Sequence, residues 1–260
     1  MRTPHANAFM RGPPDCVPLF SPFRLHLGLD LGHWVLDMRY AIISDVHGRR
    51  EQLAAVLHDA QARGAEQILC LGDVGGSDCL ELLRRVNAQA VFGNYEVSGW
   101  RRLTPEHQSW VQSWRPLLVA DDFLAVHAAP WGPEGLQTVE EFGVWLRRTG
   151  RPWRALFPYL SEDDDSLWRA LTILERADKA VLFHGHTHRQ DAWCWDPADC
   201  LRPMHSITFT IHPGHRYVVG VGSAGMPEDG SWAAYTLYDL RARQIERVRL
   251  NARGDPWTLP

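Results

Sequence analysis

Lysine is almost absent from this chain: Lys179 is the only one, and arginine supplies the rest of the 27 basic residues. Because Asp and Glu number 31, the formal net charge is -4, so no overall positive field attracts nucleic acid or anionic lipid. No apolar run approaches the roughly 18 residues of a membrane span. We therefore expect no membrane partner and no nucleic-acid partner.

Cysteine is also scarce, and its spacing is not that of a disulfide framework. The five cysteines are an odd number and include no C-x-x-C pair. This pattern is typical of proteins in a reducing compartment, and we expect a cytoplasmic protein. With 260 residues, 45% of them hydrophobic, the chain can bury one full core.

The first 37 residues differ in composition from the rest. They hold five of the 17 prolines, and they lack the apolar segment and small-residue cleavage site of a signal peptide. We expect residues 1–37 to be a loosely attached extension, residues 38–252 to form the domain, and residues 253–260 to be a tail. Equal stability and activity of a chain that begins at Met38 would support this division.

From Met38 onward, short apolar runs alternate with helical patterns. Strands are expected at residues 40–44, 66–71, 88–92, 117–120, 123–127 and 180–183, and later at 192–194, 207–211, 217–221, 232–238 and 245–250. Helices are expected at residues 51–58, 78–86 and from 104 on, and in a largely helical insert at 129–178, at 139–148 and 165–177. The early βαβα order and the later β run predict an α/β fold, a two-sheet sandwich with helices on the outer faces.

The first of these strands ends in Asp45-Val46-His47. Residues two apart on an extended chain point the same way, and ligands bind beyond the carboxyl ends of strands in α/β sheets. A carboxylate with a neutral imidazole suits manganese, iron, zinc and similar ions. Taken alone, the motif is weak evidence for a metal site, because Asp after a strand is also a common turn or helix-cap residue.

Four further segments place metal-ligand residues beside a strand end. Counted with the first motif, the candidate ligands are Asp45, His47, Asp73, Asn94, His127, His186 and His188. Each has a simpler explanation when taken singly: His127 as a core histidine, for example, or His186 and His188 as a solvated loop pair. Five such motifs in this order along the chain, each beside a strand end, are hard to produce by chance.

In this order, Asp-x-His, Gly-Asp-x-x-Gly, Gly-Asn-x-Glu, a lone His and Gly-His-x-His resemble the motifs of the calcineurin-like metallophosphoesterases. The match is to their compact bacterial and archaeal branch of small phosphodiesterases and phosphatases. It runs from Tyr40 to about Leu250 and includes residues 222–230, which look like the family's late Gly-Ser-x-Gly-x-Pro-x-Asp-Gly turn. The resemblance implies a metal-dependent phosphoric ester hydrolase.

The resemblance also implies two divalent metal ions, with manganese the first candidate and iron, zinc or nickel the alternatives. It assigns Asp45, His47 and His188 to the first ion, Asn94, His127 and His186 to the second, and Asp73 to both as a bridge. Ions roughly 3.5–4 Å apart can lower the pKa of a bridging water and hold the phosphoryl oxygens. The nucleophile would then be a hydroxide that bridges the metals, and Asn94 and His127 would lie nearest the phosphate.

Tyr95 departs from the family pattern, since many relatives carry His at the position after Asn94 to protonate the leaving group or contact the phosphate. Tyrosine, with a pKa of about 10, can donate a hydrogen bond at neutral pH but is a poorer proton shuttle. The departure favours a diester, a cyclic nucleotide or an activated ester over an ordinary monoester. His184 is either a substitute donor or a core histidine.

We therefore predict a phosphoesterase that acts on a small phosphodiester or phosphomonoester, with a nucleotide as the candidate substrate. Trp131 is either a core residue or a platform on which a nucleobase stacks. Two rivals stay open. A nuclease on the same fold would need an extended basic groove, and a non-enzymatic scaffold, like the retromer subunit that has lost metal-site residues, would carry no metal.

Overall fold

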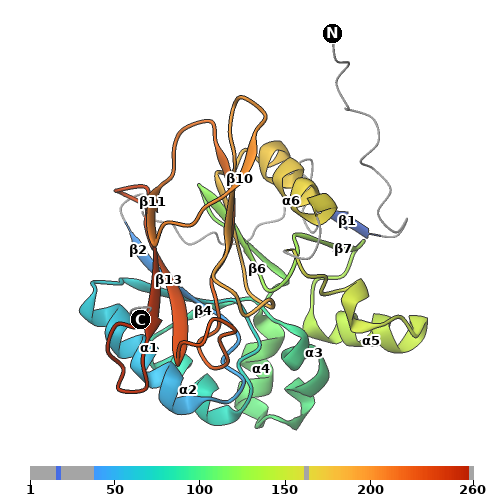
Figure 1. Ribbon diagram of the computed structural model, residues 1–260. Helices are drawn as coiled ribbons and strands as arrows, with labels where there is room; N and C mark the ends of the chain where they lie inside the picture. Colours follow the sequence, from blue (N-terminus) through green and yellow to red (C-terminus); the bar gives the residue numbers. More distant parts are fainter. Residues whose placement is uncertain (1–15, 19–37, 161–163, 258–260) are drawn as a thin grey trace.

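The computed structural model describes residues 16–18, 38–160 and 164–257 (Figure 1). Two six-stranded mixed sheets dominate the chain, and a separate two-stranded sheet joins β1 and β7. The sheets pack face to face, with helices outside them. This arrangement confirms the two-sheet α/β sandwich predicted from the sequence.

The first sheet has the order β11-β14-β13-β2-β3-β4, in which β2, β3 and β4 are parallel and the other pairs are antiparallel. Its strands are β2 Arg39–Ile43, β3 Gln67–Cys70, β4 Gln89–Ala90, β11 Thr208–Thr210, β13 Ala233–Asp239 and β14 Gln244–Leu250. The second sheet has the order β10-β9-β12-β8-β6-β5, in which β6, β8 and β12 are parallel. Its strands are β5 Leu117–Val119, β6 Phe123–Val126, β8 Val181–His184, β9 Ala192–Trp195, β10 Leu201–Pro203 and β12 Arg216–Gly220.

The central strands are apolar on both sides because both of their faces are covered. In β2, Tyr40 and Ile42 face the space between the sheets, where they share one core with Phe123 and Phe183 of the second sheet. Ala41 and Ile43 belong to a separate core on the helix side. This double burial explains why the strands read as unbroken apolar runs.

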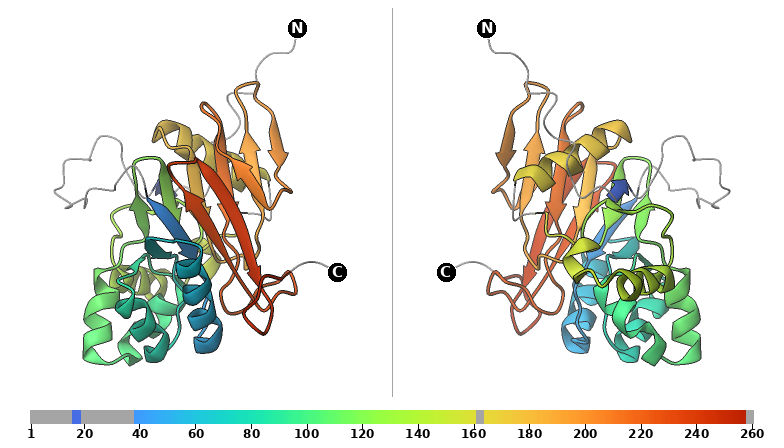
Figure 2. Two further views of the ribbon diagram at one scale, coloured as in Figure 1. Left: turned by 90° about the vertical axis from the view of Figure 1, so that its left-hand side faces the viewer. Right: turned by 90° about the vertical axis from the view of Figure 1, so that its right-hand side faces the viewer.

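The helices form the outer layers of the sandwich. They are α1 Arg50–Ala62, α2 Ser77–Arg85, α3 Asn94–Gly99, α4 Pro105–Ser113, α5 Val139–Thr149 and α6 Asp164–Arg176, with single 3₁₀ turns η1 Trp100–Arg102 and η2 Trp153–Ala155. Buried residues of α1 and α2 share a core with the outward side of the first sheet. Leu167 and Leu171 of α6 pack on Leu182 and Val218 of the second sheet. Figure 1 and Figure 2 show α6 beside the strands of the second sheet, away from α1 and α2.

Three strands were not expected from the sequence. β7 Trp131–Pro133 lies in the insert (residues 129–178) and pairs antiparallel with β1 Cys16–Pro18, and β10 follows a short turn after β9. β4 is shorter than predicted, because Val91 leaves the ladder to form a bridge with Arg115. Apart from β1, the predicted extension 1–37 lies outside the described residues, so its loose attachment stays a prediction.

The strands that carry the sequence motifs all end at one edge of the sandwich. β2, β3 and β4 reach it from the first sheet, and β6 and β8 reach it from the second. The loops that follow these strands lie side by side there. In the described ranges, none of the helices has both the length and the apolar character needed to cross a membrane.

Candidate metal centre

Backbone hydrogen bonds tie the loops after the strands to one another. The Asp45 N–H donates to the carbonyl of Gly72, and the His47 N–H donates to the carbonyl of Asp73. Within the second sheet, the Gly185 N–H donates to the carbonyl of His127 at 2.9 Å. Across the two sheets, the His186 N–H donates to Oδ2 of Asp45 at 2.8 Å. Residues far apart in sequence are thereby held in one rigid group before any ligand is considered.

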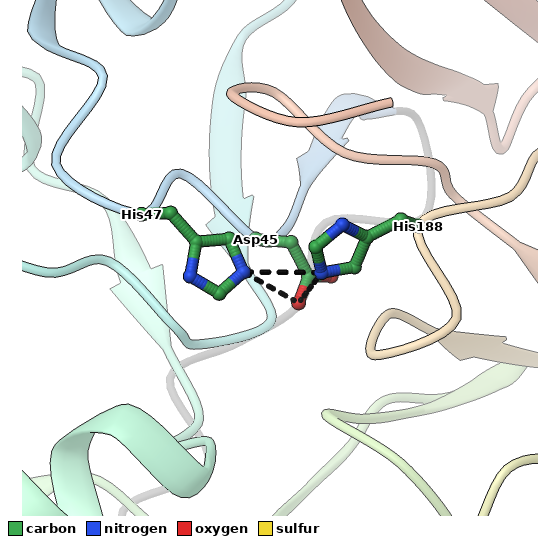
Figure 3. Close-up of side chains that lie close together, drawn as sticks. All are labelled: Asp45, His47 and His188. Carbon is green, nitrogen blue, oxygen red and sulfur yellow. Dashed lines mark hydrogen bonds and ion pairs between the residues drawn. The ribbon is translucent and has the colours of Figure 1, made fainter. Parts of the chain in front are cut away.

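Asp45, His47 and His188 form the first cluster (Figure 3). Oδ1 of Asp45 lies 3.4 Å from Nε2 of His188 and 3.7 Å from Nε2 of His47, and the two Nε2 atoms are 3.1 Å apart. Asp45 is fully buried, and its Oδ1 has no hydrogen-bond partner among the described residues. One carboxylate oxygen and two imidazole nitrogens therefore converge on one point.

Asp73, His127 and His186 form the second cluster, in which one ligand atom from each residue lies within 4.8 Å of the others. Asn94, the first residue of α3, completes it: its Oδ1 lies 3.1 Å from Nε2 of His127. The structure thus brings all seven predicted ligand residues together. Their role as ligands stays a prediction.

Asp73 faces both clusters. Its Oδ1 lies 3.5 Å from Nε2 of His127, and its Oδ2 lies 4.0 Å from Nε2 of His47. The two oxygens of one carboxylate are therefore directed to different clusters, an arrangement that suits a bridging carboxylate.

Five of the seven residues have a left-handed backbone: Asp45, His47, Asp73, His186 and His188, with φ between 50° and 63°. This conformation is uncommon for residues other than glycine and costs roughly 1–2 kcal/mol each. Such strain clusters at functional sites, where the surrounding structure holds it in place. The sharp turns bring the side chains back over the strand ends.

Two glycines leave room for this packing. A Cβ at Gly93 would collide with the Asp73 carboxylate and the His127 ring, and one at Gly185 would collide with Ser44 and Asp45. Only a residue without a side chain lets the loops approach so closely.

Two of the four histidines have a ring nitrogen bonded to a backbone carbonyl. Nδ1 of His127 lies 2.8 Å from the oxygen of Leu71, and Nδ1 of His188 lies 2.8 Å from the oxygen of Met226. Metal-ligating histidines almost always carry such a bond, because it fixes the tautomer and leaves the other nitrogen free to bind.

The pKa values of the site residues reflect burial opposed by nearby charge. Burial would raise the pKa of Asp45, but the imidazoles of His188 and His47 outweigh it and hold the pKa well below its usual range. Burial raises the pKa of Asp73 to about 6, and burial together with the charge of His127 lowers the pKa of His186 to about 3. In the part of the chain that the structure describes, Asp45 and Asp73 form ion pairs with histidines only.

Glu96 closes the Gly-Asn-x-Glu motif, but the sequence assigned it no role in the site. It is buried, and its carboxylate accepts three backbone N–H groups at 2.8–2.9 Å, from Asp73, Val74 and Gly93. One side chain thereby joins the loop of Asp73 to the loop of Asn94. The capping-box spacing, with Glu three residues after Gly93, was the signal that could have revealed it.

Three other candidates lie as follows. Tyr95 is 47% exposed, its ring contacts that of His47 edge-on at 4.5 Å, and its N–H donates to Oδ1 of Asp73. His184 is buried, as expected of a core histidine, and burial lowers its pKa.

Trp131 is buried in the core between β6 and α6, with the Arg169 guanidinium 4.4 Å from its ring centre. Stacking of a nucleobase on Trp131 is therefore wrong, because the ring is not open to a substrate.

Buried carboxylates, converging imidazole nitrogens and strained turns together suit divalent cations, which carboxylate and imidazole ligands bind readily. The sequence model of the calcineurin-like phosphoesterase superfamily domain matches residues 38–243. The chain belongs to this superfamily. It is a metal-dependent phosphoester hydrolase, and the resemblance described from its motifs is confirmed.

Two relatives of this phosphoesterase illustrate the similarity. An uncharacterized protein of Methanocaldococcus jannaschii is 24% identical over 222 residues, which cover 81% of this chain and 86% of that protein. The crystal structure of a metallophosphoesterase from Sphaerobacter thermophilus is 24% identical, covers 82% of this chain and 89% of its own, and has a TM-score of 0.60. At this identity the second likeness shows the shared fold.

Proposed function

We propose that this phosphoesterase binds two divalent metal ions and hydrolyses a small phosphodiester or phosphomonoester, with a diester or cyclic nucleotide preferred. The observation that carries the proposal is Asp73, whose two carboxylate oxygens face different clusters. Asp45, His47 and His188 would hold one ion, and Asn94, His127 and His186 the other. When bound, such a pair of ions polarises the phosphoryl group and activates water as the nucleophile.

The remaining steps rest on side chains of this protein. Asn94 and His127 lie at the second cluster, where the Asn94 amide can donate to a phosphoryl oxygen. Tyr95 lies half-exposed beside His47, so its hydroxyl is the group that would donate a hydrogen bond to the leaving oxygen. A weak proton shuttle here favours esters whose leaving group needs little protonation, which supports a diester or an activated ester.

Manganese is the first candidate for both ions, with iron, zinc or nickel as alternatives, because the mixed oxygen and nitrogen ligands accept each of them. A small substrate such as a nucleotide, rather than nucleic acid, agrees with the net charge of -4.

The free thiols of Cys70, Cys79, Cys194 and Cys200 support a cytoplasmic location. The start of the family match at residue 38 supports Met38 as the first residue of the domain.

A substrate panel tests the proposal. The purified protein with Mn²⁺ is assayed on p-nitrophenyl phosphate, bis-p-nitrophenyl phosphate, and 2′,3′- and 3′,5′-cyclic nucleotides. We expect metal-dependent hydrolysis, fastest on a diester. Salt-sensitive cleavage of DNA or RNA with no turnover of these esters would favour the nuclease, and a protein without metal or activity would favour the scaffold.

A further inference from the structure

One segment of the insert, residues 153–160, reaches across to the metal centre. The ring of Tyr159 stacks on the imidazole of His186, with centres 4.5 Å apart and planes 16° apart. The ring of Phe157 lies 5.7 Å from that of His127 and 6.2 Å from that of His186. These contacts fall on the two histidines of the second cluster.

The same segment also covers the imidazole of His186. The Tyr159 ring is stacked on its face, and the Phe157 ring lies against it with the planes 49° apart. These ring contacts restrict rotation of the imidazole. The first cluster has a different support, since His188 is held by the carbonyl of Met226 in the turn at residues 222–230.

Such supporting contacts affect metal affinity. Substitution of a residue that orients a ligating histidine typically weakens metal binding by about 10- to 100-fold. A contact that touches only one cluster should therefore change the affinity of only one ion.

We propose that Tyr159 is a positioning residue for His186, through which the insert controls binding of the second metal ion and leaves the first ion unaffected. The inference rests on the proposed dinuclear site. It gives the insert a role beyond packing, because the insert then sets how tightly the second ion is held.

The test measures Mn²⁺ binding to the metal-free full-length chain by calorimetry, with elemental analysis after gel filtration. In Tyr159→Ala, one ion should bind as in the wild type and the other about 10- to 100-fold more weakly. The EPR signal of a coupled Mn²⁺ pair should give way to that of isolated Mn²⁺. Tyr159→Phe, which keeps the stacked ring, should bind both ions like the wild type.

A matched control is Trp145→Ala, which removes another half-buried aromatic ring of the insert, one that contacts Arg151. It should leave both affinities unchanged. The inference is overturned if Tyr159→Ala binds both ions normally, or if it weakens both equally, as a general loss of structure would. A wild-type chain that binds fewer than two ions would instead contradict the proposed function itself.

Discussion

The two clusters of the candidate metal centre have similar side chains but are held by different parts of the chain. Behind the first cluster lies the turn at residues 222–230, in which Ser223 donates to the carbonyl of Asp45 and Met226 bonds to His188. Behind the second lie the carbonyl of Leu71 and the insert residues Phe157 and Tyr159. The comparison predicts that the two halves can be altered separately.

The two halves touch where the His186 N–H donates to Oδ2 of Asp45 at 2.8 Å. Asp73 joins them directly through its carboxylate oxygens, and Glu96 joins them indirectly, by fixing the backbone at Asp73 and just before Asn94. Substitutions at these positions should affect both ions, whereas substitutions elsewhere should affect one.

Asp73→Asn should have the largest effect. The amide keeps the shape of the side chain but offers one neutral oxygen, so the shared negative charge between the clusters is lost. We expect kcat/KM on bis-p-nitrophenyl phosphate to fall at least ~10³-fold, which corresponds to about 4 kcal/mol. Asp78→Asn, at an exposed position of α2, is the matched control. Full activity in Asp73→Asn would refute the bridging role.

His188→Ala and His186→Ala should separate the two halves. Each variant loses a proposed ligand of one cluster, so each should retain one ion and bind the other more than about 100-fold more weakly. Elemental analysis after gel filtration counts the ions that stay bound. If both variants lose both ions together, the clusters are not independent.

Glu96→Gln should weaken both ions by a smaller factor. The substitution replaces an acceptor oxygen with an NH₂ group that meets backbone N–H donors, so at least one buried donor loses its partner. We expect a loss of roughly 1–3 kcal/mol in the free energy of unfolding and about 10- to 100-fold weaker binding of each ion. Glu106→Gln, an exposed side chain on α4, should change neither quantity.

Acidic pH should have the smallest and most gradual effect on metal binding. Despite burial, the charge of Asp73 raises the pKa of His127, and Asp45 raises the pKa of His188. Both rings therefore keep a proton to higher pH than free histidine, and a metal ion must displace it. His186, with a pKa lowered to about 3, is already neutral.

The direction in which pH changes metal binding follows from proton linkage. A histidine whose pKa is higher in the folded chain than in the unfolded chain stabilises the metal-free protein. This contribution is fully present below the unfolded pKa of about 6.5 and is lost as pH rises through the folded pKa. Metal-bound protein has no such proton to lose, so the rise in Tm caused by Mn²⁺ should grow between about pH 6 and pH 8. A rise in Tm that is constant over this range would contradict the account.

The sequence predicted the strand ends and the seven candidate ligands because each motif is local. Asp45 and His47 follow one apolar run, so their place beyond a strand end could be inferred from that motif alone. Strand alternation is not what brings them together, because β2 ends at Ile43 and both residues have a left-handed backbone. The stack of Tyr159 on His186 and the three bonds of Glu96 depend on contacts between distant segments, which local patterns do not encode. Trp131 shows the same limit: only the packing of α6 reveals that its ring is buried.

Titration of the metal-free chain with Mn²⁺ tests the dinuclear mechanism most directly. Hydrolysis of bis-p-nitrophenyl phosphate is followed as metal is added, at protein concentrations above the dissociation constants. A dinuclear mechanism predicts that activity continues to rise until two equivalents are bound and then stays constant. Full activity at one equivalent, or no activity at any metal concentration, would contradict it.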